Sequence, residues 1–132
     1  KITFAEDIDF FARCFSNYDL AYAFDACHTQ NTTISESLTQ SSTRDKTYPD
    51  LTKYLGKSAD LDAFIYFYMY CFCQRLKTEN RKSEVRGLRK KIKLKSLNLF
   101  QVILIYLPQP LYMLVRKLKD ILMKLGFQPN TY

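Results

Sequence analysis

Apolar residues recur at helical spacing from the first turns of the chain. Ile8, Phe11 and Phe15 follow one another three or four residues apart, which places them on one face of a helix. Thr3 and Glu6 have the spacing of a capping box, in which both side chains satisfy backbone groups at a helix start. The pattern predicts one long helix, or two consecutive helices, from about Thr3 to His28.

Hydroxyl side chains dominate the next segment. Of the nineteen residues from Thr29 to Thr47, ten are Ser or Thr and few are apolar. Such side chains compete for backbone hydrogen bonds and weaken helix formation. Residues 29–47 are therefore predicted to form a loop inside a single helical domain that spans residues 1–132.

A short helix and a long aromatic helix are predicted next. Pro49 fits the first position of a short helix that Gly56 can end. Ser58 can cap the following helix, and the run AFIYFYMYCFC, residues 63–73, is apolar on all sides. Aromatic enrichment also occurs in strands, so an α+β fold is the alternative. The cap and the absence of nearby Gly or Pro favour a central helix over about 59–76.

An uncharged run of nineteen residues, 97–115, contains two prolines. Pro108 and Pro110 disfavour helical geometry in the residue before them, so a bend inside the run is expected. A membrane-spanning helix is the alternative, because spanning helices tolerate proline. The preferred prediction is a C-terminal helical hairpin whose second arm is amphipathic. The apolar face of that arm carries Leu111, Leu114, Val115, Leu118, Ile121, Leu122 and Leu125. Together these elements predict an all-α fold, a compact bundle of about five helices with a central aromatic helix.

Charge is unevenly distributed along the chain, whose formal net charge is +7. Residues 1–74 carry six basic and ten acidic groups, whereas residues 75–95 carry ten basic and two acidic groups. Residues 96–132 add four basic groups and one acidic group. A basic segment of this density can displace condensed counterions from a nucleic-acid backbone with little sequence preference.

The basic segment is predicted to be helical, with Val85, Leu88 and Ile92 docking one side of the helix. The opposite side would then present cations to a polyanion. The predicted nucleic-acid-binding residues are Arg81, Lys82, Arg86, Arg89, Lys90, Lys91, Lys93 and Lys95. A solvated surface and an anionic membrane surface are the alternative interpretations of the same charges.

Catalytic and metal-binding patterns are weak. His28 is the only histidine, and the three glycines are isolated, so neither a catalytic triad signature nor a phosphate-binding loop is present. Cys27 and His28 with Cys71 and Cys73 supply possible zinc ligands, but the Cys-x-Cys spacing inside an apolar run is not that of a zinc knuckle. We predict no enzyme activity, no metal and no cofactor.

Cysteine usage bears on the compartment. Cys71 and Cys73 fall within an apolar run, where free Cys behaves as a small hydrophobic residue. All four cysteines are therefore predicted to be free thiols in an intracellular, cytoplasmic protein.

The predicted function is non-enzymatic binding of the nucleic-acid backbone, as a subunit or accessory factor of a larger complex. The alternative is a protein-interaction or membrane-associated adaptor that docks through its aromatic and C-terminal amphipathic helices.

Overall fold

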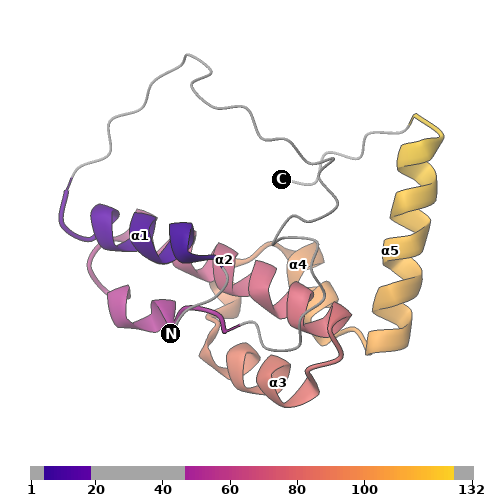
Figure 1. Cartoon of the computed structure of the whole chain (residues 1–132), viewed down its shortest axis with the longest axis horizontal. Helices are drawn as coiled ribbons and strands as arrows, with labels where there is room; N and C mark the ends of the chain where they lie inside the picture. Colours follow the sequence, from indigo (N-terminus) through magenta and orange to yellow (C-terminus); the bar gives the residue numbers. More distant parts are fainter. Residues whose placement is uncertain (1–4, 19–46, 127–132) are drawn as a thin grey trace. The chain divides into compact units, whose positions relative to one another are not determined.

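The computed structural model describes residues 5–18 and 47–126 (Figure 1). This part of the chain forms five α-helices and two short 3-10 helices and contains no strand, so the predicted all-α fold of about five helices is confirmed and the α+β alternative is wrong. The elements are α1 (Glu6–Phe15), η1 (Leu51–Tyr54), α2 (Ala59–Thr78), α3 (Lys82–Lys91), η2 (Leu94–Ser96), α4 (Leu99–Tyr106) and α5 (Gln109–Lys124).

The chain divides into two compact units, Lys1–Phe72 and Cys73–Tyr132. The division falls within α2. The single domain over residues 1–132 stays a prediction. The loop predicted for residues 29–47 lies outside the described residues, apart from Thr47.

Helix α1 begins later than the capping-box pattern predicts. The residue before its first turn is Ala5, which has a left-handed φ of 58° and makes no side-chain cap. Thr3, which was predicted to cap this helix, lies outside the described residues. Helix α1 ends at Phe15, and the predicted continuation to His28 lies outside the described residues beyond Tyr18.

A hydrogen bond and an ion pair connect α1 to η1 within the first unit. The Asp9 carboxylate accepts a hydrogen bond from the Tyr54 hydroxyl at 3.2 Å and pairs with Lys53 Nζ at 2.9 Å. The start of η1 differs from the prediction: Asp50 caps it by accepting from the backbone N–H of Thr52, and Pro49 precedes the cap. Because Asp50 occupies the cap position, the first helical position is Leu51 and not Pro49 as predicted.

The aromatic helix α2 is confirmed. Its start is capped as predicted, because the backbone N–H of Leu61 donates to Ser58 Oγ at 3.1 Å. In the first unit it buries Leu61, Ile65 and Met69, and the ring of Phe64 meets that of Phe15 edge to face at 5.3 Å. Burial of apolar side chains from α1, η1 and α2 forms the core of this unit.

The basic segment is not one continuous helix. Helix α2 ends at Thr78, and Asn80 then takes a left-handed φ of 60°. The backbone N–H of Arg81 donates to the Leu76 carbonyl at 3.0 Å, and that of Asn80 donates to the Lys77 carbonyl at 3.2 Å. This pair of bonds is a Schellman motif, in which Asn occupies the position that glycine usually takes. The chain then turns into α3.

The bend predicted near the two prolines is confirmed. Helix α4 ends at Tyr106, and α5 begins at Gln109 after Leu107 and Pro108. A complete capping box starts α4: Asn98 Oδ1 accepts from the Gln101 N–H at 2.8 Å, and Gln101 Oε1 accepts from the Asn98 N–H at 3.0 Å. Across residues 5–18 and 47–126, no helix combines the length and apolarity that a membrane crossing needs.

Candidate functional site

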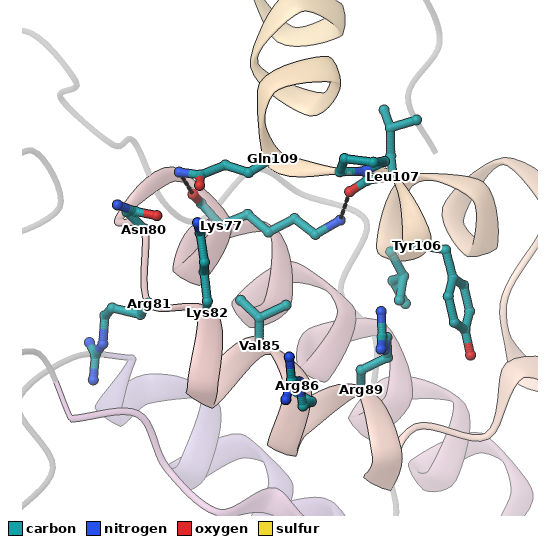
Figure 2. Close-up of a pocket in the computed structure, with 12 residues that line it drawn as sticks. Lys77, Asn80, Arg81, Lys82, Val85, Arg86, Arg89, Tyr106, Leu107 and Gln109 are labelled. Atoms are coloured by element: carbon teal, nitrogen blue, oxygen red, sulfur yellow. Dashed lines mark hydrogen bonds between the residues drawn. The ribbon is translucent and has the colours of Figure 1, made fainter.

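A cavity of about 310 Å³ opens in the second unit, where the end of α2, helix α3 and the α4–α5 junction meet (Figure 2). Its wall combines cations, two amides and apolar side chains. The lining residues are Lys77, Asn80, Arg81, Lys82, Val85, Arg86, Arg89, Ile105, Tyr106, Leu107, Pro108 and Gln109.

Lys77 forms the inner wall of the cavity and joins three helices. Its side chain leaves only 6% of its surface exposed, and Nζ donates to the carbonyls of Leu104 at 2.5 Å and Leu107 at 3.0 Å. Leu104 belongs to the last turn of α4 and Leu107 is its C-cap, so Nζ lies at the helix C-terminus, where the dipole favours a cation. Figure 2 shows the side chain reaching from α2 to Leu107. Lys77 lies within the basic segment, residues 75–95, but is not among the predicted binding residues, because nothing in the sequence shows that it reaches the end of α4.

Lys77 is held by further contacts that include α5. Nζ lies 5.3 Å from the centre of the Tyr112 ring, and Gln109 Nε2 donates to the Lys77 backbone carbonyl at 3.1 Å. Burial lowers the pKa of Lys77, and the nearby charge of Arg89 lowers it further, whereas Cys73 raises it. Lys77 is therefore a structural cation that fixes the helix junction.

Arg81 lines the cavity, but two glutamates neutralise it. Its Nε and Nη2 both donate to the Glu84 carboxylate at 2.6 Å, a bidentate geometry, and Nη1 lies 3.4 Å from Glu79. Glu79 also pairs with Arg75 at 3.1 Å. These acids hold Arg81 at the turn between α2 and α3, so its charge is already compensated before any ligand arrives.

Lys82, Arg86 and Arg89 are the cations that α3 presents to the cavity. They are spaced at i, i+4 and i+7, so they share one face of the helix. Among the residues that the structure describes, no acidic side chain forms an ion pair with any of them. Arg89 is half-buried, and its guanidinium lies 4.8 Å from the centre of the Tyr106 ring. Lys82 and Arg86 are exposed.

The remaining predicted binding residues are outside the cavity. Lys90, Lys91, Lys93 and Lys95 are exposed and do not contribute to its lining. The structure thus brings together four of the eight predicted residues, Arg81, Lys82, Arg86 and Arg89, and adds Lys77. The predicted docking side of α3 is partly buried: Ile92 is 6% exposed, and Val85 and Leu88 are half-buried.

The chemistry of this lining suits an anion. Its cations can donate to phosphate oxygens, the Asn80 and Gln109 amides can donate or accept, and Tyr106 offers a half-exposed ring. Among the described residues no group of three His, Cys, Asp or Glu is placed to hold a metal ion. Cys14, Cys71 and Cys73 are free thiols, whereas Cys27 and His28 lie outside the described residues.

Comparisons with known proteins give no match: no family model, curated sequence or solved structure resembles this chain at a significant level.

Proposed function

We propose that the chain binds the phosphate backbone of nucleic acid through the exposed basic face of α3, without catalysing a reaction. The observation that supports this most directly is the set of cations at the cavity mouth, Lys82, Arg86 and Arg89, which pair with no acid among the described residues. The lining offers no carboxylate, histidine or thiol for acid–base or nucleophilic chemistry.

The spacing of the cations supports a backbone ligand. Residues 82–89 span about 10 Å along the helix axis at 1.5 Å per residue, long enough to contact two or three successive phosphates. Arginine contributes a planar fork that matches phosphate oxygens, and lysine contributes a mobile point charge. Such contacts position a protein on nucleic acid without reading sequence, so we expect similar affinity for unrelated sequences.

The Arg89–Tyr106 pair supports contact with bases as well. The Arg89 guanidinium lies 4.8 Å from the centre of the half-exposed Tyr106 ring, and both groups offer planar surfaces beside the other cations of the cavity. Unstacked bases pack on such surfaces, whereas bases inside a duplex cannot reach them. We therefore expect single-stranded nucleic acid to bind more tightly than duplex of the same length.

The test compares two double variants that lose the same charge. Lys82→Gln/Arg86→Gln removes exposed cations at the cavity, and Lys90→Gln/Lys95→Gln removes exposed cations elsewhere in the basic segment. Binding is measured by fluorescence anisotropy over a range of salt concentrations. We expect the log–log salt slope of the cavity variant to be shallower by about 1.5 units, because each lost phosphate contact removes about 0.7 to 0.9.

The control variant should change the slope by less than half that amount. Equal slope changes in the two variants would show that diffuse charge, rather than the cavity, attracts the polyanion. Absence of parent binding at low salt would overturn the proposal outright. Circular dichroism checks that both variants keep their helices, which Gln supports.

A further inference from the structure

Helix α5 leaves its apolar face uncovered in the described structure. Tyr112, on another side of the helix, is buried against Lys77, but the leucine-rich face is open. Leu114 is 63% exposed, Leu118 56% and Ile121 54%. The other members of this face, also exposed, are Leu111, Val115, Leu122 and Leu125. A contiguous apolar face of this extent is costly in water and marks an interaction site.

The charges of α5 show which partner fits this face. Lys119 follows Val115 by four residues and Lys117 precedes Ile121 by four, so a lysine lies about 40° beyond each border of the apolar face. Asp120 is the only acidic residue of α5, and it lies on the opposite side of the helix. The apolar face is therefore bordered by cations on both sides, and the one anion is directed away from it.

We infer that α5 docks on an anionic membrane surface, lying in the interface with its leucine face toward the acyl chains. Lysines at the borders can extend their apolar stems along the helix and place their ammonium groups among lipid phosphates. Residues 73–132 carry fourteen basic and three acidic side chains, and this net charge of +11 adds long-range attraction to an anionic leaflet. Helix α4 exposes Leu99, Phe100 and Ile103 as further apolar surface in the same unit.

A second copy of the chain fits the face less well. Two α5 helices packed through their leucines would bring the border lysines Lys117 and Lys119 near those of the partner helix, with no acid at either border to compensate them. Like charges beside an apolar seam oppose pairing, whereas an anionic surface attracts them.

The first experiment measures vesicle binding of the full chain. The probes are vesicles of phosphatidylcholine mixed with phosphatidylglycerol and vesicles of phosphatidylcholine alone. We expect at least about tenfold tighter binding to the anionic vesicles. Leu118→Gln should weaken this binding about tenfold, because it removes an apolar side chain from the centre of the face. Met123→Gln, an exposed apolar residue outside the face, is the matched control and should change binding less than about twofold.

The second experiment compares the lysines at the borders of the apolar face with the other basic residues of α5. Lys117→Gln/Lys119→Gln should weaken vesicle binding about tenfold, whereas Arg116→Gln/Lys124→Gln loses equal charge farther from the apolar face and should weaken it less than about threefold. Equal losses in both variants would overturn a defined docking face and indicate diffuse attraction instead.

Insertion is read from a single tryptophan, because the chain contains none. The emission of Leu118→Trp should shift to the blue when anionic vesicles are added, and that of Met123→Trp should not. Emission of Leu118→Trp that is already blue-shifted in buffer, or a dimer that Leu118→Gln dissociates, would mean that the protein itself covers the face, and would overturn the inference. Nucleic-acid binding measured in parallel should be unchanged by Leu118→Gln, which keeps this test distinct from the function proposed above.

Discussion

Replacing Lys77 by Met tests whether a buried cation stabilises the helix junction behind the cavity. Met keeps an unbranched side chain of similar length but has no N–H to donate. In Lys77→Met, the carbonyls of Leu104 and Leu107 lose the donor that lies 2.5 and 3.0 Å from them. Both carbonyls belong to half-buried residues at the end of α4, so water replaces the lost donor only in part.

The change in unfolding free energy expected for Lys77→Met is the difference between two opposed effects. Hydrogen bonds from a charged donor contribute about 1.5 to 3 kcal/mol each, and a cation at a helix C-terminus contributes about 0.3 to 1 kcal/mol. Burying an ammonium group costs several kcal/mol, which offsets much of that gain. Because removal also leaves two acceptors without their donor, we expect Lys77→Met to lower the free energy of unfolding by about 2 kcal/mol.

The assay is urea unfolding followed by far-UV circular dichroism, with Lys82→Met as control. Lys82 is exposed and its replacement makes the same chemical change, so we expect it to alter the free energy of unfolding by less than about 0.5 kcal/mol. Equal stability of the two variants would refute the reasoning, because the cost of burying the charge would then cancel the hydrogen bonds.

The difference in unfolding free energy between the parent and Lys77→Met should depend on pH, and the lowered pKa of Lys77 gives the direction. Burial lowers the pKa of Lys77 from 10.5, so between its folded pKa and 10.5 the unfolded chain binds more protons than the folded chain. The free energy of unfolding then rises with pH through this group. The stability difference between the parent and Lys77→Met should therefore widen as pH rises from neutral toward 10.5. A difference that narrows over this range would mean that folding raises the pKa of Lys77, and would contradict the conclusion that burial outweighs the carbonyl contacts.

Two further predictions concern stability. Asn98→Ala removes half of the α4 capping box and should lower the free energy of unfolding by about 1 kcal/mol in the same assay, while Ser96→Ala, exposed and outside the box, should change it little. Burial raises the pKa of the Cys73 thiol, so the unfolded chain releases this proton first and stability falls as pH rises through about 9. Cys73→Ala should make that decline shallower by at most about 1.4 kcal/mol per pH unit, and an unchanged decline would contradict it.

The features predicted correctly from the sequence are those that depend on residues close together in the chain. Ser58 caps α2, and the chain bends at Pro108, because a cap needs one side chain and a proline restricts the residue before it. The end of α2 at Thr78 lies within two residues of the predicted end at about 76, but the left-handed turn that follows it was not predicted, although its signal is also local. Asn80 tolerates a left-handed φ better than most residues, and the two Schellman hydrogen bonds depend on it.

The differences among the cations could not be predicted from the sequence, where residues 75–95 form one basic segment. Lys77 is buried because it caps carbonyls 27 and 30 residues later in the chain, a pairing that only the tertiary fold brings about. Arg81 is neutralised because the turn after α2 places Glu79 and Glu84 on either side of it. Lys82 has the same side chain as Lys77 but is exposed, and unlike Arg81 it pairs with no acid among the described residues. The surroundings of a cation therefore determine whether it can meet a ligand.

The proposals for α3 and α5 both invoke anions, and their chemistry separates them. Phosphate binding by Lys82 and Arg86 requires charge alone, so it should weaken steeply with salt and ignore the apolar face of α5. Docking of α5 requires Leu118 as well as the border lysines, so part of it should persist at high salt, where charges are screened but apolar burial is not. If one undivided basic surface served both ligands, Lys82→Gln/Arg86→Gln and Leu118→Gln would weaken nucleic-acid and vesicle binding in parallel. Two separate surfaces require the opposite: each variant weakens one kind of binding and leaves the other within about twofold.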